Sequence, residues 1–310
     1  MFSSTPLAHD AMFYDSDQEF ASTLIPFVQA GLDRGDAVVA AVTRENIAVL
    51  RDGLGADAAA VSFFDRDYWY QRPTSTVAGW QGLLRDAADA GHRHVRVIGE
   101  VGFGTADRHP SWTRYESAIN DVFAQAPAWI VCPYDRRALP AAVLDDARRT
   151  HPTVFGNGRS ESTSYEPPER FLRAVPEPMP PTAGPPVLTL RITDDVALAR
   201  HGLAALLDAR GWTGTERGDD VMLAMSEIVT NGIRHGRGRR DLRVWIDGRT
   251  VTCEVTDNGD GPADPLAGYR PPTPLSTGGR GLWISQQVCD AFGIHHHDGT
   301  TVVRFTVVLP

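Results

Sequence analysis

The feature that most constrains the fold of this chain is a proline-rich segment near its middle. Eight prolines fall between residues 160 and 186, several of them in adjacent pairs. Proline lacks a backbone N–H and its ring clashes with a preceding helical turn, so this density cannot continue a helix or a central strand. The segment predicts a semi-stiff linker at 160–185, which separates a domain at 7–159 from a second domain at 186–310.

Before this segment, strand and helix patterns alternate. Ser16 and Glu19 have the spacing of a capping box, and apolar residues at helical spacing follow as far as Gly35, a natural stop. Short apolar runs predict buried strands at 37–43, 61–65, 95–99 and 129–132, and helical patterns fall at 45–54, 77–90, 112–124 and 141–149. Because continuous apolar strands alternate with helices, we predict an α/β domain with a mostly parallel sheet covered on both faces.

After the segment the pattern changes to α+β. We expect a strand at 187–192, helices at 196–207, 219–235 and 282–292, and a final strand at 301–309. Between them, apolar and polar residues alternate at 242–246 and 251–255, on either side of Asp247-Gly248. Asp-Gly between alternating runs is a hairpin signal, so antiparallel pairing is expected here.

Composition limits the functions that this chain can have. The formal net charge is −9 and the sequence contains no lysine, which excludes a lysine-dependent phosphate loop and disfavours direct nucleic-acid binding. The three cysteines are widely spaced without a metal-binding pattern, as is usual in a reducing cytoplasm. The run His295–His297 indicates a polar turn rather than a metal site, because successive side chains diverge. With neither a signal-peptide pattern nor an apolar run of ~20 residues, we expect a cytoplasmic protein without membrane association.

Three short motifs in the second half carry polar chemistry, and the first is Ser226–Asn231. Glu227 and Asn231 are four residues apart and therefore share one face of the expected helix. Their hard oxygen atoms suit Mg²⁺ and its waters. A solvated helix face is the simpler alternative for this motif taken alone.

The second and third motifs are rich in glycine. Asp257 ends an expected strand in Asp257–Gly261, where its carboxylate could accept a hydrogen bond from the amine of adenine. The same residues could also form a plain turn. Thr277–Leu282 leads into an expected helix, and amide groups before a helix N-terminus favour an anion.

Taken in order, these motifs resemble the N, G1 and G2 boxes of the ATPase fold shared by gyrase, Hsp90-type chaperones, histidine kinases and anti-sigma factor kinases. The resemblance covers about 186–310 and is strongest to the anti-sigma factor serine kinases, through Glu227–Asn231. It implies a Bergerat-type ATP-binding fold with a mixed sheet and helices on one face. Gly232 stands where relatives usually have alanine.

The resemblance also implies a role for each motif residue. Glu227 would be the general base for a protein hydroxyl, and Asn231 would coordinate Mg²⁺. Residues 262–278 would form a lid over the nucleotide. Thr300 is assigned to support the adenine-binding aspartate, with Thr301 as the alternative. The remaining ATP-binding residues would be Asp257, Gly259 and Gly261 around adenine, and Gly279, Arg280 and Gly281 around the phosphates.

The function implied by this resemblance is phosphorylation of a partner protein. The chain would be an anti-sigma regulatory factor that binds a sigma factor and, with ATP and Mg²⁺, phosphorylates a STAS-type anti-anti-sigma protein on serine or threonine. A homodimer is also possible. One alternative is a catalytically silent module that sequesters its partner, because Ser276-Thr277 stands where some relatives have a lid arginine. An orphan histidine kinase-like protein is another alternative, whereas a sensor histidine kinase is disfavoured by the proline-rich segment.

The first half resembles the MEDS sensory domain over about residues 7–152. The resemblance lies in His9–Tyr14, Gly99-Glu100, Tyr115-Glu116, Cys132–Asp135 and His151-Pro152. It implies a RecA/KaiC-like layout and the sensing of a small molecule or another signal.

Ligands of parallel sheets bind beyond the carboxyl ends of the strands, and several polar residues of this domain follow such ends. We therefore predict a sensory pocket there. The alternative is that Cys132 is a small core residue and Tyr134 a capping aromatic. The candidate pocket residues are His9, Glu100, Cys132, Tyr134 and Asp135.

Overall fold

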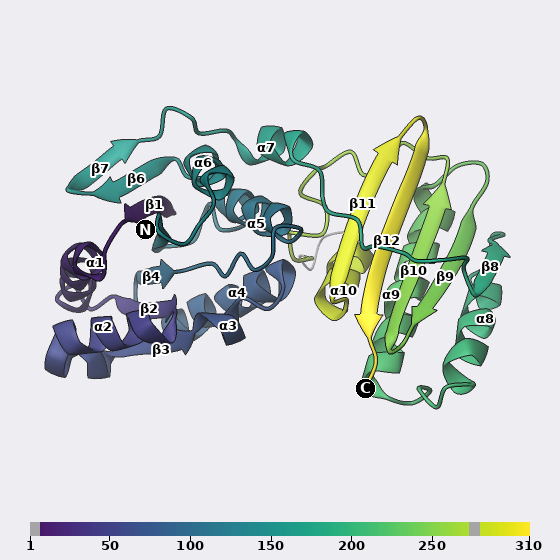
Figure 1. Cartoon of the computed structure of the whole chain (residues 1–310), viewed down its shortest axis with the longest axis horizontal. Helices are drawn as coiled ribbons and strands as arrows, with labels where there is room; N and C mark the ends of the chain where they lie inside the picture. Colours follow the sequence, from purple (N-terminus) through teal and green to yellow (C-terminus); the bar gives the residue numbers. More distant parts are fainter. Residues whose placement is uncertain (1–6, 273–279) are drawn as a thin grey trace. The chain divides into compact units, whose positions relative to one another are not determined.

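The computed structural model describes residues 7–272 and 280–310, in two compact units whose boundary lies between Val175 and Pro176 (Figure 1). The boundary falls inside the proline-rich segment, but later than the expected linker start at 160. Residues before it belong to the first unit, as β7 (Gly158–Glu161) and α7 (Pro168–Ala174). A helix tolerates proline at its first position, and α7 is fixed by buried Phe171 and by Arg114, which donates to the Leu172 carbonyl at 2.7 Å.

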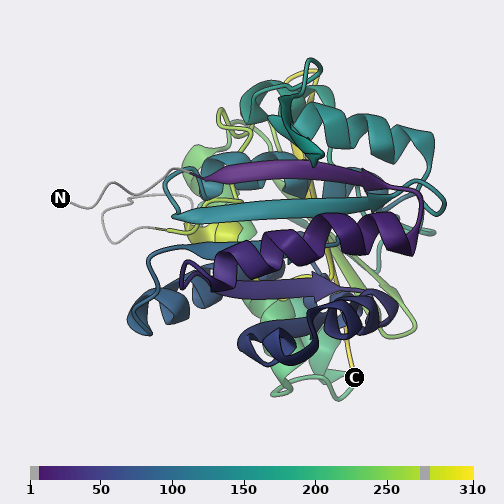
Figure 2. The ribbon, with the colours of Figure 1, turned by 90° about the vertical axis from the view of Figure 1, so that its left-hand side faces the viewer.

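The described residues of the first unit contain a seven-stranded sheet in the order β3-β2-β4-β5-β1-β6-β7. Every pairing is parallel except that of β6 with β7, so the expected mostly parallel sheet is confirmed. Figure 2 shows β1 and β5 side by side, with α1 in front of the sheet. Strands β1 and β6 were not predicted. The bounds are β1 Ala8–Tyr14, β2 Ala37–Val42, β3 Val61–Asp65, β4 Val95–Gly99, β5 Ala128–Asp135 and β6 Thr153–Gly156.

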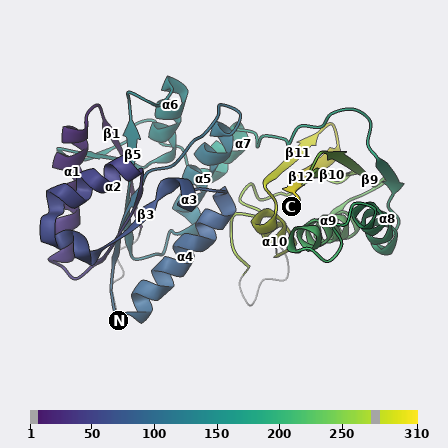
Figure 3. The same cartoon turned by 60° about the horizontal axis from the view of Figure 1, so that its bottom comes forward.

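Helices cover both faces of this sheet (Figure 3). On one face, α1 and α2 bury Phe20, Leu24 and Leu50 against the strands, and the Ser16 hydroxyl caps α1 by accepting from the Glu19 amide at 3.1 Å. On the other face, Trp80 of α4 donates to the Tyr115 hydroxyl of α5 at 2.9 Å. The bounds are α1 Asp17–Leu32, α2 Arg44–Leu54, η1 Gly55–Ala60, α3 Arg66–Trp69, α4 Pro73–Asp89, α5 His109–Val122 and α6 Ala141–Thr150.

The described residues of the second unit form a five-stranded sheet in the order β11-β12-β10-β9-β8. All of its pairings are antiparallel, so the expectation of a mixed sheet is wrong. Tight turns set two of these four pairings: Gly248 has φ 54° between β9 and β10, and Asp298 and Gly299 have φ 49° and 68° between β11 and β12. The bounds are β8 Leu188–Arg191, β9 Asp241–Asp247, β10 Thr250–Asp257, β11 Ala291–His297 and β12 Thr300–Val308.

Helices α8 (Ala197–Asp208), α9 (Glu216–His235) and α10 (Arg280–Val288) lie on one face of this sheet (Figure 3). They enclose a core that includes Leu203, Ile228 and Phe305. Helix α10 ends earlier than expected, because residues 291–297 pair with β12 instead. His295–His297 therefore lie in strand β11 and not in a turn.

The opposite face of the sheet is covered by residues 177–184, the remainder of the proline-rich segment. His295 contacts the Glu177 carbonyl through Nε2 at 2.7 Å, Arg304 donates to the Pro180 carbonyl at 2.8 Å, and Trp245 donates to the Gly184 carbonyl at 3.1 Å. These residues belong structurally to the second unit, which extends the unit beyond the expected start at 186. Across residues 7–272 and 280–310, no helix combines the length and the apolarity needed to cross a bilayer.

Candidate functional site

Helix α9 positions the acidic and amide side chains of the first motif. The Thr215 hydroxyl caps the helix by accepting from the Gly218 amide at 3.0 Å, and Ile228 and Val229 bury the core side. Glu227 and Asn231 point toward the start of α10. A Cβ added to Gly281 would lie 2.6 Å from Glu227 Oε2 and 3.1 Å from Asn231 Nδ2. The structure thus brings the first and third motifs together.

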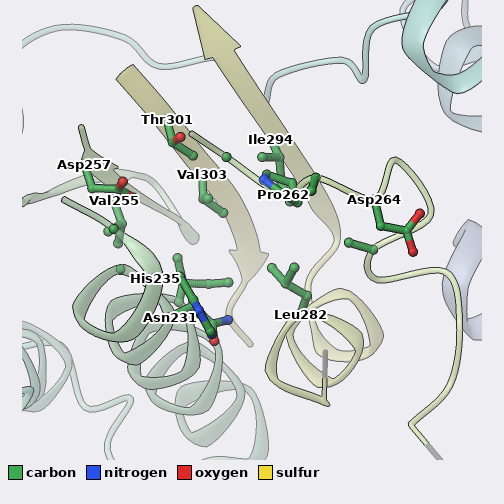
Figure 4. Close-up of a pocket in the computed structure, with 16 residues that line it drawn as sticks. Asn231, His235, Val255, Asp257, Pro262, Asp264, Leu282, Ile294, Thr301 and Val303 are labelled. Atoms are coloured by element: carbon green, nitrogen blue, oxygen red, sulfur yellow. The ribbon is translucent and has the colours of Figure 1, made fainter. Parts of the chain in front are cut away.

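A cavity of about 330 Å³ opens beside this junction. Asp257, at the end of β10, is 8% exposed, and its Oδ1 accepts from the Gly259 amide at 2.6 Å. Asn231 and His235 reach the cavity from α9, and Pro262 and Asp264 from the expected lid (Figure 4). The apolar part of the lining consists chiefly of Ile228, Val255, Leu282, Ile294 and Val303.

Thr301, and not Thr300, lies at the turn that follows Asp257. Thr301 lies opposite Asp257 in the pairing of β12 with β10, lines the cavity and donates its hydroxyl to the Gly259 carbonyl at 2.9 Å. His296 Nδ1 lies 3.1 Å from the same hydroxyl. The structure thus favours Thr301 over the assigned Thr300 for the supporting role, because successive strand residues face opposite sides of a sheet.

At two glycines near Asp257, the backbone comes so close to the Asp257 side chain that a Cβ atom would not fit. A Cβ on Gly236 would lie 2.7 Å from Asp257 Cγ, and one on Gly259 would lie 2.7 Å from Asp257 Oδ1. Gly261 has φ +70° and lines the cavity. Gly232 differs from these, since a Cβ there would come no closer than 3.6 Å to Val255.

The phosphate side of the expected site is described only in part. Arg280 begins α10 and is exposed. Gly279, Ser276 and Thr277 lie outside the described residues, as does the end of the lid at 273–278. Within the described part of the chain, the cavity lining contains no arginine.

A larger cavity, of about 830 Å³, lies in the first unit at the carboxyl edge of the parallel sheet. Residues at or just after the ends of β1 to β5 line it, among them Tyr14, Arg66, Glu100 and Asp135. Two of the predicted sensory residues, Glu100 and Asp135, are therefore in a common cavity.

Hydrogen bonds hold the acidic groups of this cavity. Glu100 accepts from the Thr43 amide at 3.1 Å, from Asn46 at 2.8 Å and from Arg66 at 2.9 Å. Burial nevertheless raises the pKa of the Glu100 carboxyl above its ordinary value. Hydrogen bonds from Arg137 hold the pKa of Asp135 below its ordinary value.

The other predicted sensory residues, His9, Cys132 and Tyr134, do not line this cavity, so the prediction of a single pocket is wrong for them. Their side chains are buried, and Cys132 Sγ lies 3.4 Å from His9 Nε2. The prediction missed Asn46 and Arg66. Both could have been found, because Asn46 follows a Thr43 helix cap after β2 and Arg66 directly follows β3.

Comparison with known families gives a match for each unit. Residues 8–152 match the MEDS model, the methanogen/methylotroph DcmR sensory domain, and residues 190–307 match the histidine kinase-like ATPase domain. A search of characterised proteins found no match.

Several solved structures are similar to part of this chain. The RsbU and RsbW domains of Rv1364c from Mycobacterium tuberculosis are 22% identical, with 40% of this chain and 33% of that one covered and a TM-score of 0.28. The histidine kinase domain of the blue-light activated kinase of Erythrobacter litoralis EL346 is 16% identical, with 37% and 61% covered and a TM-score of 0.27. The histidine kinase domain of the E. coli osmosensor EnvZ is 17% identical, with 42% and 93% covered and a TM-score of 0.25.

Proposed function

We propose that this chain, in which a MEDS domain precedes a histidine kinase-like ATPase domain, is a cytoplasmic anti-sigma regulatory factor that uses ATP and Mg²⁺ to phosphorylate a STAS-type anti-anti-sigma protein on serine or threonine. The observation that carries the proposal is the convergence of Glu227 and Asn231 on Gly281, next to the cavity that contains Asp257. This places a carboxylate, an amide and a helix N-terminus around one point.

The cavity fits the adenine end of ATP. Its volume lies at the lower end of the range usual for small-molecule sites, and its apolar walls suit a base. The Gly259 amide donates a hydrogen bond to one carboxylate oxygen of Asp257. The second oxygen is left to accept from the exocyclic amine of adenine.

The phosphates would lie toward the start of α10. Amide groups at a helix N-terminus bind anions, and the absence of a side chain at Gly281 keeps that end open. Asn231 would hold Mg²⁺, which when bound neutralises phosphate charge and orients the transferred group. Arg280, exposed at the first position of α10, would supply a further positive charge.

Glu227 would act on the attacking hydroxyl. Phosphoryl transfer depends on positioning and charge stabilisation more than on covalent chemistry, and a carboxylate beside the phosphate site can accept the proton of an incoming serine or threonine. Autophosphorylation on His9 or His151 is disfavoured, because these side chains are 2% and 0% exposed.

The MEDS domain would regulate this activity through the cavity at the carboxyl edge of its sheet. Acidic and basic groups face one another there, which suits a small polar ligand. We also propose that the domain shares the RecA/KaiC-like layout, on the basis of its strand order.

The test of the ATP site is calorimetry with and without Mg²⁺ on the full chain. We expect Asn231→Ala to abolish Mg²⁺-dependent ATP binding. We expect Glu227→Ala to retain binding and to lose transfer by about 10²–10⁴-fold, the usual contribution of a general base. Glu216→Ala, an exposed acid on the same helix, is the matched control.

The test of the substrate class uses radiolabelled ATP and a purified STAS-type protein. Acid-stable phosphate on that protein supports the serine or threonine kinase. Acid-labile phosphate would instead indicate an orphan histidine kinase. ATP binding without transfer would indicate a silent module that sequesters its partner.

A further inference from the structure

Four buried side chains meet inside the MEDS domain, and none of them lines the large cavity. They are His9, Glu116, Cys132 and His151, with exposed fractions of 2%, 1%, 3% and 0%. Each offers one nitrogen, sulfur or oxygen atom, and these atoms all lie within 4.8 Å of one another.

The fold brings these residues together from distant parts of the chain. Cys132 is in register with Ala11 in the parallel pairing of β5 with β1, so Cys132 and His9 are diagonal neighbours on one face of the sheet. Glu116 reaches the same point from α5, and His151 follows α6 directly. Both helices cover the face that His9 and Cys132 share.

Hydrogen bonds outside the cluster orient both imidazoles. His9 Nδ1 lies 3.0 Å from Asn120 Oδ1, and the Asn120 amide nitrogen donates to the Thr150 carbonyl at 2.8 Å, which defines the amide orientation. His151 Nδ1 lies 2.8 Å from the Ala147 carbonyl. Because both outer partners are acceptors, each Nδ1 carries the proton and each Nε2 presents a lone pair to the cluster.

Apart from the Cys132 thiol, which lies 3.4 Å from His9 Nε2, the cluster consists of acceptors without a matching donor. Each Nε2 lies 3.2 Å from Glu116 Oε2, at ion-pair distance but outside hydrogen-bond geometry. Both Glu116 oxygens and His151 Nε2 have no hydrogen-bond partner. Buried polar atoms are rarely left in this state, and a cation at their centre would satisfy all of them at once.

We propose that His9 Nε2, His151 Nε2, Cys132 Sγ and a Glu116 oxygen bind one divalent transition-metal ion, with Zn²⁺ the best match. Two nitrogens, one sulfur and one oxygen suit four-coordinate Zn²⁺, whereas Ca²⁺ and Mg²⁺ prefer oxygen alone. Binding requires the thiolate, so the Cys132 proton is released to solvent. The thiolate and the carboxylate then balance the charge of the ion, which suits a site closed to water.

The position of the site links it to the large cavity. Cys132 lies on β5, three residues before the cavity residue Asp135, and His9 lies on β1, which ends at the cavity residue Tyr14. The Tyr134 ring packs edge-on against His151, with a centroid separation of 5.6 Å. A bound ion would cross-link β1, β5, α5 and α6 directly behind the cavity.

The experiment is a Co²⁺ titration of the full chain after removal of metal by a chelator, with elemental analysis of the protein as purified. We expect uptake of one ion per chain, with intense tetrahedral d–d bands and a thiolate-to-cobalt charge-transfer band that Zn²⁺ displaces. Cys132→Ser should lose the charge-transfer band. The matched control is Cys253→Ser, a buried cysteine of the second unit, which should keep it.

A second variant tests the outer hydrogen bond. Asn120→Ala should weaken Zn²⁺ binding by about 10–100-fold, the usual effect of removing the hydrogen-bond partner of a ligating histidine. Circular dichroism shows whether each variant is folded, and Zn²⁺ should raise the unfolding temperature of the wild type but not that of Cys132→Ser. The proposal is overturned if the folded wild type takes up no stoichiometric metal, or if Cys132→Ser binds it as tightly.

Discussion

Replacing Thr301 by valine removes one hydroxyl from the ATPase domain while preserving the shape of the side chain. That hydroxyl donates to the Gly259 carbonyl at 2.9 Å, and the Gly259 amide in turn donates to Asp257 at 2.6 Å. Thr301 and Gly259 are both buried. The substitution therefore leaves a buried carbonyl without its donor and loosens the turn that orients the aspartate.

The expected magnitude follows from that geometry. A buried acceptor that loses its partner costs about 1–3 kcal/mol, so Thr301→Val should lower the free energy of unfolding by that amount. ATP affinity should fall less, because the turn is formed in the free protein as well. A loss of about 1 kcal/mol of binding free energy corresponds to a dissociation constant that is roughly fivefold larger.

The assay pairs urea unfolding with calorimetry of ATP binding, and Thr300→Val is the matched control. Thr300 is adjacent in sequence, faces away from the cavity and pairs with His297 at the edge of the sheet. Its replacement should change stability by no more than about 0.5 kcal/mol. Equal effects of the two substitutions, or a larger effect at Thr300, would refute the assignment of the supporting role to Thr301.

Three further predictions concern single side chains. Asp257→Asn should weaken ATP binding by about 10–100-fold in calorimetry, because a hydrogen bond to a charged group is worth about 1.5–3 kcal/mol. Unchanged affinity would show that Asp257 does not bind adenine. Gly232→Ala should raise the free energy of unfolding by about 0.4–1 kcal/mol, since the new Cβ meets nothing closer than 3.6 Å. Gly236→Ala should lower the free energy of unfolding, since its new Cβ would lie 2.4 Å from the Gly232 carbonyl oxygen. Urea unfolding curves that rank the two variants the other way would contradict this reasoning. Burial raises the pKa of Glu100, so the folded state holds the carboxyl proton more tightly than the unfolded state does. The resulting stabilisation is present at low pH and is lost as pH rises through the raised pKa. Glu100→Gln should flatten that part of the plot of stability against pH, and an unchanged pH slope would count against the burial effect.

The sequence predicts the ATPase domain well where chemistry depends on neighbours along the chain. Glu227 and Asn231 share a helix face because of their spacing, and Asp257 ends a strand because the turn dipeptide Asn258-Gly259 follows it. The choice between Thr300 and Thr301 depends on strand register, which one residue of slip inverts. Periodicity could not resolve it.

The metal-ligand cluster illustrates a different limit. Its members lie at positions 9, 116, 132 and 151, and none of the spacings resembles a metal motif. Only the pairing of β1 with β5 and the packing of α5 and α6 bring them together. Strand β1 itself was missed, since His9 and Asp10 interrupt its apolar pattern.

The segment that joins the two domains is very short. The Val175 carbonyl accepts from Arg114 at 2.5 Å, and the Glu177 carbonyl contacts His295 at 2.7 Å, so Pro176 alone stands between two anchored residues. The proline ring fixes its own φ near about −65° and keeps the preceding residue extended. The covalent connection is therefore a short segment with few rotatable bonds rather than a flexible tether.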